Sequence, residues 1–90
     1  MNELVITPTP TPNPNAHKFT LNRPVGATML NLRAAAEAEN HPLARELFNL
    51  PGVTNVFLTA DFVTVNKRPD VSWETLEPLI LPILQAHLGR

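Results

Sequence analysis

The second half of the chain holds two adjacent runs, residues 53–59 and 62–67, in which apolar side chains recur at alternate positions. Alternation is typical of β-strands, and apolar side chains on both faces are expected of a central strand. In the first run, one face carries Val56 and Leu58 and the other carries Val53 and Phe57. With residues 59–61 as a tight turn, the two runs predict a β-hairpin.

Further strands are predicted nearer the N-terminus. Residues 16–22 alternate, with Phe19 and Leu21 on one face and Lys18 and Thr20 on the other, and residues 3–7 are short, apolar and β-branched, which suits an edge strand. Prolines at positions 8, 10, 12 and 14 exclude a helix, because each proline fixes its own φ and restricts its predecessor. Residues 8–15 are therefore expected to form a rigid connector between two strands.

A short helix is predicted to begin at Pro42, because the first helical position tolerates a missing N–H. Its apolar face comprises Leu43, Ala44, Leu47 and Phe48. Pro51 and Gly52 end it, with Gly52 free to adopt left-handed geometry. Residues 28–40 before it are expected to form a short strand and then one or two exposed helical turns, because RAAAEAE favours a helix but lacks large apolar residues.

The C-terminal part predicts a longer helix with Ser72 as its N-cap. Its apolar face comprises Trp73, Leu76, Ile80, Ile83, Leu84 and His87. Pro78 and Pro82 each remove a backbone hydrogen bond, so the helix is expected to bend. We predict one helix rather than two, because the apolar face continues through both prolines.

Composition limits the function classes. Ninety residues with 43% apolar and 17% charged content indicate a single folded α+β domain, residues 1–90. A net charge of −1 gives no general attraction to nucleic acid or an anionic membrane. The absence of cysteine excludes disulfides and thiolate-held zinc or iron–sulfur clusters. No signal peptide or membrane-spanning run is recognised, so we expect a cytoplasmic protein.

Candidate catalytic and metal-binding groups have simpler explanations. The histidines, at positions 17, 41 and 87, lack helical spacing and are expected to be exposed or to cap helices. Four carboxylates could in principle pair for acid–base catalysis, but two lie in turns and two at the start of a helix, where negative charge is favoured: Asp61, Asp70, Glu74 and Glu77. Ser72 has no GxSxG context, and Trp73 is favoured as a core residue over a stacking platform. We expect no enzyme, no metal site and no cofactor.

The hairpin suggests an interaction surface. If helices cover one face of the sheet, then Phe62 or Phe57 on the other face, with Val56 or Leu58 nearby, leaves an apolar patch of the kind that binds partners. Alternatively, the proline-rich connector folds over this patch. The sequence favours the two equally.

An ordered set of short motifs, spread along almost the whole chain, matches the sequence pattern of a known protein family. It comprises Thr11 to Asn15 with Lys18 and Phe19, then Pro42 to Ala44, Leu47, Phe48, Gly52, Val53, Val56 and Phe57, then Asp61 to Val65 with Lys67, and finally Trp73, Leu76, Pro78 and Ile80. With these residues the chain resembles the N-terminal domain of Nfu-type iron–sulfur scaffold proteins. Residue 41 departs from the family, in which serine often caps the helix, because it is His41 here.

The resemblance implies an α+β fold with an antiparallel sheet of four to five strands and two main helices on one face. It also implies a role in iron–sulfur cluster assembly. Full-length family members hold the cluster with a CxxC motif in a separate C-terminal domain, and this chain has no cysteine. We therefore expect the accessory half without the scaffold half, and cluster ligation is not carried over.

The resemblance predicts a non-catalytic monomer that binds an iron–sulfur scaffold or a client apoprotein, and neither nucleic acid nor a membrane. Its matched residues without an obvious structural role are the predicted recognition surface, together with Phe62: Asn13, Asn15, Lys18, Asp61 and Lys67. The alternative is a weak binder of iron or another divalent cation through carboxylate and histidine ligands.

Overall fold

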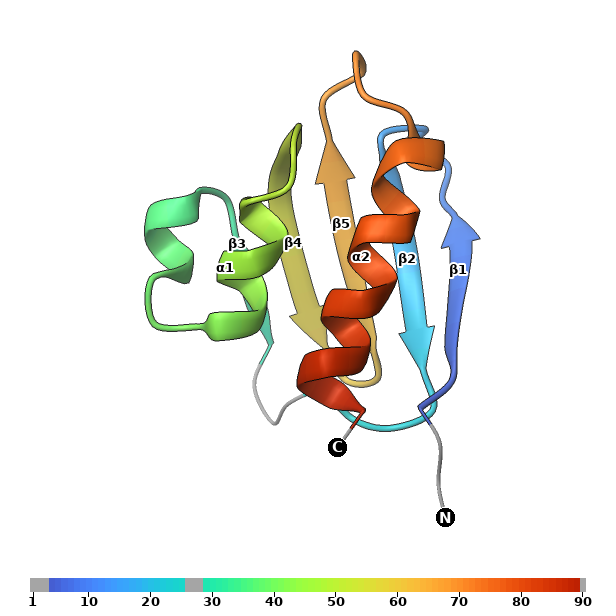
Figure 1. Cartoon of the computed structure of the whole chain (residues 1–90), viewed down its shortest axis with the longest axis vertical. Coiled ribbons are helices and arrows are strands. Elements are labelled where there is room, and N and C mark those ends of the chain that lie inside the picture. The colour runs from blue at the N-terminus through green and yellow to red at the C-terminus, as the bar shows by residue number, and fades with distance from the viewer. Residues whose placement is uncertain (1–3, 26–28, 90) are drawn as a thin grey trace.

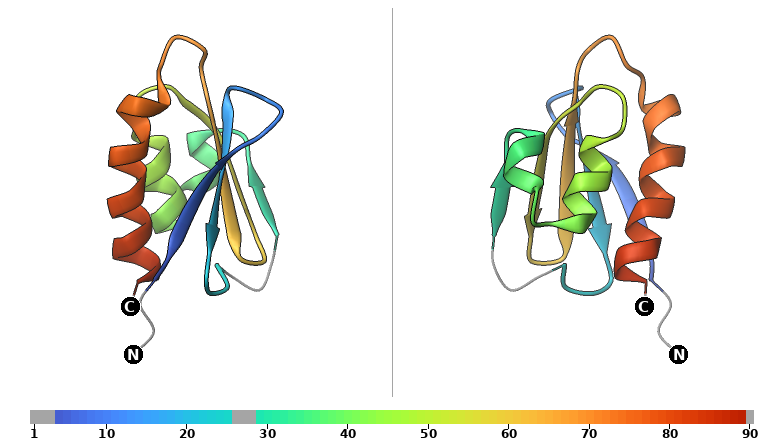
Figure 2. Two further views of the ribbon diagram at one scale, coloured as in Figure 1. Left: turned by 90° about the vertical axis from the view of Figure 1, so that its right-hand side faces the viewer. Right: turned by 60° about the vertical axis from the view of Figure 1, so that its left-hand side comes forward.

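The computed structural model describes residues 4–25 and 29–89. Its elements are β1 (Ile6–Pro10), β2 (Ala16–Leu21), β3 (Leu30–Leu32), the 3-10 helix η1 (Ala35–Ala38), α1 (Pro42–Phe48), β4 (Val53–Thr59), β5 (Phe62–Lys67) and α2 (Trp73–Leu88). Across the described residues, the five strands form one antiparallel sheet in the order β1-β2-β5-β4-β3 (Figure 1). Both α-helices cover one face of this sheet and leave the other face open (Figure 2). The predicted α+β fold is confirmed.

The core lies between the helices and the covered face of the sheet. In the hairpin, Val56 pairs with Val65 and Leu58 with Val63, and all four side chains are buried. The largest fully buried side chains come from β2, α1, the hairpin and α2: Phe19, Leu47, Val56, Val63, Val65, Leu76, Ile80 and Leu84. They belong to one continuous hydrophobic cluster. The apolar faces predicted for the hairpin and for both helices therefore meet in a single core.

The first strand lies later in the chain than predicted, because β1 includes Pro8 and Pro10 of the expected connector. In β2, the backbone N–H of Leu21 donates to the carbonyl oxygen of Asp61 beside β5. The backbone groups of Lys18 and Thr20 therefore point the other way, toward β1. Thr7 pairs with Thr20 and Thr9 with Lys18, so the backbone nitrogens of Pro8 and Pro10 point outward from the edge of the sheet. An edge strand tolerates proline at outward positions, because no N–H is needed there.

A β-bulge corrects the predicted position of Val53. The pairing of β4 with β5 shifts between Val53 and Asn55, so that Val53 lies opposite Lys67 and Asn55 opposite Asn66. The extra residue reverses the alternation beyond the bulge. Val53 therefore packs against the core, and not on the face that carries Phe57.

The segment between β3 and α1 follows the prediction of a short strand and a helical turn, although residue 28 lies outside the described residues. The helical turn is not wholly exposed, because the Ala38 side chain is fully buried. His41 caps α1 by accepting a hydrogen bond from the Ala44 N–H through Nδ1 at 3.3 Å. Gly52 follows α1 with φ +83°, and a Cβ there would lie 2.5 Å from Val71 Cγ2.

The last helix is continuous through both internal prolines, as predicted, and Ser72 Oγ caps it by accepting from the Thr75 N–H. Pro78 and Pro82 leave the carbonyl groups of Glu74 and Pro78 without their usual helical donors. All three residues are exposed, so both prolines lie on the solvent side of the helix. In the part of the chain that the structure describes, no helix is both long and apolar enough to span a membrane.

The turn of the hairpin places an alanine in left-handed geometry, with φ +46° at Ala60. Two-residue hairpin loops need positive φ because only such turns match the twist of the strands. The turn is also hydrogen-bonded to the β2 end, since Ala60 O accepts from Val25 N at 2.9 Å and Asp61 O from Leu21 N at 2.7 Å. The fold therefore holds a side chain where glycine would be less strained.

We expect Ala60→Gly to raise the free energy of unfolding by about 1 kcal/mol, because glycine carries no Cβ penalty at positive φ. Urea unfolding followed by circular dichroism measures the change. The matched control is Ala36→Gly in η1, where φ is not positive and glycine should destabilise. Equal effects of the two substitutions would contradict this account of the turn.

Candidate partner-binding surface

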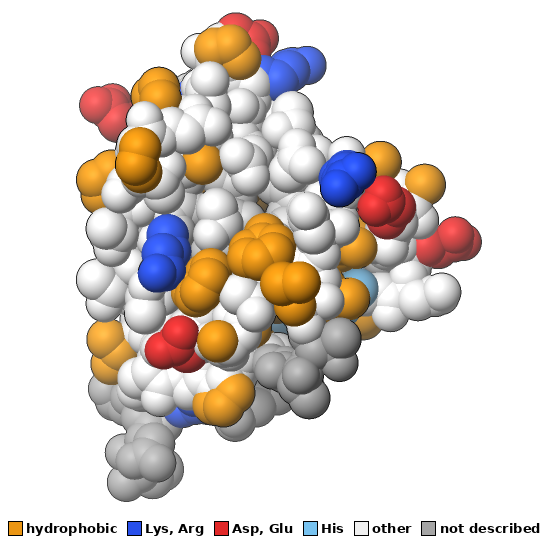
Figure 3. Space-filling view, turned by 180° about the vertical axis from the view of Figure 1, so that it is seen from behind, with side chains coloured by type: hydrophobic (Ala, Val, Ile, Leu, Met, Phe, Trp, Pro, Cys, Tyr) orange, Lys and Arg blue, Asp and Glu red, His pale blue; other side chains and the backbone are white. Residues whose placement is uncertain are grey.

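The sheet face without helices carries hydrophobic side chains near its middle (Figure 3). Strand alternation places Phe57 of β4 and Phe62 of β5 on this face, because their neighbours Val56 and Val63 are buried in the core. Both phenylalanines remain partly exposed. We name these two side chains, together with Lys18 of β2, the aromatic patch.

The register of the sheet brings the aromatic patch together. Phe57 lies opposite Thr64, and Thr64 lies opposite Lys18, so Phe62 is the diagonal neighbour of both Phe57 and Lys18. The two rings are 6.1 Å apart between centroids, with an interplanar angle of 44°. The Lys18 Nζ lies 4.3 Å from the centroid of the Phe62 ring, in the range of a cation–π interaction.

The alternative that the proline-rich segment covers these rings is not what the structure shows. Its first part pairs with β2 at the edge of the sheet as β1. The aromatic patch is thus accessible, and it presents two tilted rings and one ammonium group. Val56 and Leu58, expected beside them on one interpretation, belong to the core instead.

Asp61 lies exposed in the hairpin turn, next to Phe62 in the chain. It borders a shallow hollow of about 480 Å³, whose other lining residues are Leu21, Asn22, Arg23, Pro24 and Ala60. The Asp61 side chain is therefore accessible at the end of the sheet beside the aromatic patch.

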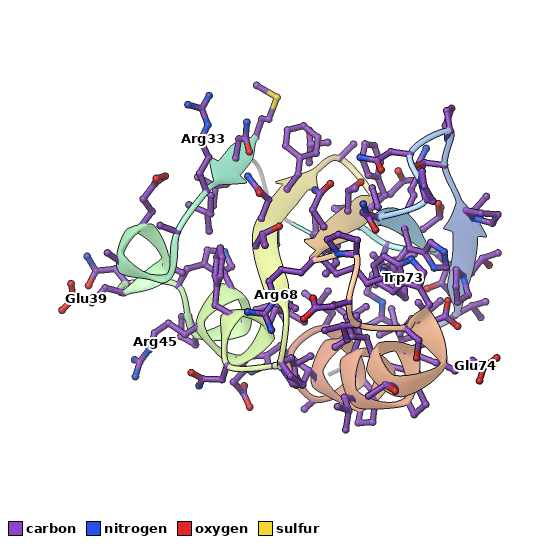
Figure 4. All side chains as sticks on the ribbon, turned by 90° about the horizontal axis from the view of Figure 1, so that it is seen from above. Arg33, Glu39, Arg45, Arg68, Trp73 and Glu74 are labelled. Atoms are coloured by element: carbon purple, nitrogen blue, oxygen red, sulfur yellow. The ribbon has the colours of Figure 1, made fainter. Side chains whose placement is uncertain are left out.

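A second polar cluster lies on the covered side of the sheet, beside the start of α2. Trp73 stacks on His17 at 3.9 Å between centroids and donates its indole N–H to Pro14 O at 3.0 Å. His17 Nδ1 lies 2.9 Å from Glu77 Oε2. Figure 4 shows Trp73 between α2 and the sheet, whereas Glu74 beside it points away. This cluster joins β2 and the β1–β2 loop to α2.

Lys67 belongs to this second cluster and is only 8% exposed. Its Nζ donates to Asn15 Oδ1 and to Arg68 O, each at 3.3 Å, and lies 5.5 Å from the Trp73 ring centroid. Asn13 Oδ1 in turn accepts from the Asn15 N–H at 2.9 Å. These contacts give Asn13, Asn15 and Lys67 structural roles in holding the β1–β2 loop.

The structure thus divides the predicted recognition residues. Lys18 and Phe62 lie together on the open face with Asp61 at its end, whereas the other three lie in or against the β1–β2 loop. The set of recognition residues chosen from the sequence left out Phe57. Its position in the hairpin register, diagonal to Phe62, was the signal that could have added it.

The histidines have specific partners. His41 caps a helix as predicted, but His17 is half-buried against Trp73 and was wrongly expected to be exposed or capping. His87 pairs with Glu46 and so connects α2 to α1. Trp73 acts as a stacking platform for His17, and it also packs against the core. Within residues 4–25 and 29–89, no three His, Cys, Asp or Glu side chains are grouped to hold a metal ion.

The family model described as "Scaffold protein Nfu/NifU N terminal" matches residues 6–90. The chain belongs to the Nfu/NifU N-terminal family. This confirms the resemblance inferred from the sequence, and the family is one associated with iron–sulfur cluster assembly.

Two curated members of the Nfu/NifU family illustrate the sequence similarity. NifU-like protein 5, mitochondrial, of Arabidopsis thaliana is 39% identical over 70 residues, which cover 73% of this chain and 24% of the relative. The human NFU1 iron-sulfur cluster scaffold homolog, mitochondrial, is 40% identical over 63 residues, which cover 68% of this chain and 25% of the relative. The match thus spans about a quarter of each relative.

Solved structures share the Nfu/NifU N-terminal fold. The NifU-like protein of Saccharomyces cerevisiae superposes with a TM-score of 0.83 at 30% identity, covering 98% of this chain and 83% of that one. Protein SAV1430 of Staphylococcus aureus gives a TM-score of 0.74 at 25% identity, covering 92% of this chain and 99% of that one. The second comparison shows the fold in a chain of almost the same extent.

The two lysines over aromatic rings should differ in their effect on stability. We expect Lys67→Ala to lower the free energy of unfolding by about 2 kcal/mol, because a buried stem and its hydrogen bonds are lost. Lys18→Ala should cost less than about 1 kcal/mol, the range of an exposed cation–π contact. Chemical denaturation of both variants gives the comparison, and a larger loss for Lys18→Ala would contradict the division of roles.

Proposed function

We propose that this domain is a non-catalytic interaction module that binds a scaffold or a client apoprotein during iron–sulfur cluster assembly or delivery. The aromatic patch is its docking surface. The observation that supports this role most strongly is the pair of partly exposed phenylalanine rings in contact on an uncovered sheet face. Aromatic side chains are enriched at the centres of protein–protein interfaces, where they contribute much of the binding energy.

Family membership supports the proposed setting. The human relative is named an iron–sulfur cluster scaffold homolog, and the family model describes the N-terminal part of such scaffold proteins. This chain has no cysteine, so it supplies no thiolate for a cluster. A docking role assigns the cluster to the partner, and the domain contributes recognition.

The second function suggested by the sequence was weak binding of iron or another divalent cation. It would need several oxygen and imidazole ligands at one place. In the described part of the chain, His17 and His87 each face a single carboxylate, and no third ligand joins either pair. We therefore do not propose this function.

The docking role predicts that Phe62→Ser weakens binding to the partner at least about tenfold, because a central aromatic contact is removed. Biolayer interferometry with purified iron–sulfur scaffold and client apoproteins from the same organism provides the measurement. Leu79→Ser is the matched control, since Leu79 is an apolar residue that is 41% exposed on α2. It should bind like the wild type.

Circular dichroism and urea unfolding first establish that both variants are folded. The proposal is wrong if a folded Phe62→Ser variant binds as tightly as the wild type. It is equally wrong if the wild type binds none of the assembly components.

A further inference from the structure

The open face of the sheet has an unusual distribution of charge. Its outward strand positions are occupied almost entirely by small polar residues and the two phenylalanines: Thr7, Thr9, Ala16, Lys18, Thr20, Asn31, Asn55, Phe57, Thr59, Phe62, Thr64 and Asn66. Among these positions, Lys18 is the single charged residue. Figure 3 shows the hydrophobic centre of this face with a basic side chain beside it.

Lys18 also lacks an ion-pair partner among the residues that the structure describes. Within the described residues, no carboxylate oxygen lies within 4.0 Å of its ammonium group. By contrast, Arg68 is paired with Asp70 at 3.3 Å, and the buried Lys67 is held by two oxygen acceptors. In the described part of the chain, the Lys18 ammonium group lies against the face of the Phe62 ring instead.

From this arrangement we infer the chemistry of the partner: an acidic protein segment in which a carboxylate stands beside an apolar side chain. The apolar side chain packs on Phe57 and Phe62, and the carboxylate pairs with Lys18. This inference rests on the proposed function, since it specifies what the aromatic patch receives.

The physical reason is the loss of water on docking. An apolar group over the two rings also shields the Lys18 Nζ, which lies only 4.3 Å from the Phe62 centroid. A desolvated cation without a counter-charge is costly, whereas a carboxylate supplied by the partner restores the balance. A basic group of the partner placed at Lys18 would bring like charges together, whereas the Asp61 carboxylate lies farther along, in the hairpin turn at the end of the sheet.

The phenylalanine also fixes the position of the cation. The negative face of the ring attracts the ammonium group and holds it beside the apolar centre. The carboxylate and the apolar side chain that the patch recognises must then be neighbours in the partner. A single cation also does not form the basic stripe that nucleic acid requires, so a protein segment is the occupant that the charges favour.

The test uses three synthetic peptides with blocked ends and a central Leu-Phe pair, flanked by Glu, by Gln or by Lys. Each is titrated to millimolar concentration into the ¹⁵N-labelled full chain, and amide shifts are followed by NMR. We expect the Glu peptide to bind about fivefold tighter than the Gln peptide, the most that one exposed ion pair supplies. The shifts should centre on Lys18, Phe57 and Phe62.

Two variants identify the charge responsible. In Lys18→Gln, the Glu peptide should bind no tighter than the Gln peptide, and the affinity of the Gln peptide should not fall, because no unpaired cation is then covered. Arg45→Gln is the matched control, because Arg45 is an exposed cation that points away from α1 (Figure 4). It should keep the preference for the Glu peptide.

The inference is overturned if wild-type protein binds the Glu and Gln peptides equally, or if the preference persists in Lys18→Gln. Shifts away from the aromatic patch, or no shifts with any peptide, also overturn it. None of these outcomes disproves the docking role, which is decided by the separate measurement with Phe62→Ser and the assembly proteins. The two proposals can therefore fail independently.

Discussion

The register of the β4–β5 hairpin is the constraint on which the other features depend. Pairing Val56 with Val65 and Leu58 with Val63 directs four apolar side chains toward the helices. The same alternation necessarily directs Phe57 and Phe62 to the opposite face, and a slip of one residue would exchange the two sets. Both α-helices lie on the other side of the sheet, so no described helix covers these rings. The core and the aromatic patch are thus two results of one pairing.

Much of this architecture could be predicted from local patterns. The hairpin, the helix that begins at Pro42 and the helix capped by Ser72 each have a clear period and a defined end signal, and all three are present. The extent of β1 and the orientation of Val53 were missed, because both depend on a neighbouring strand. Proline is tolerated in β1 only because the proline nitrogens face outward from the sheet. A bulge cannot be located without knowing the register of the partner strand.

The candidate site was predictable to the same degree. Lys18 was chosen from the residues shared with the family and Phe62 was added to that set, but only the register of the sheet places the two side chains on one face. Asn15 and Lys67 could not be separated from them, since they lie 52 residues apart and meet only when the β1–β2 loop reaches the end of β5. The residue types gave no warning, because both lysines approach an aromatic ring. What distinguishes them is burial, and burial is a property of the assembled fold.

The edges of the sheet bear on how a partner can dock. At β1 the outward positions include Pro8 and Pro10, which have no N–H to offer an added strand. At the other edge, β3 comprises only Leu30–Leu32, which is short for a template. Recognition by backbone pairing is therefore disfavoured at both edges. The open face, by contrast, offers side chains in a fixed arrangement, so specificity must come from the chemistry of the groups that Phe57, Phe62 and Lys18 contact.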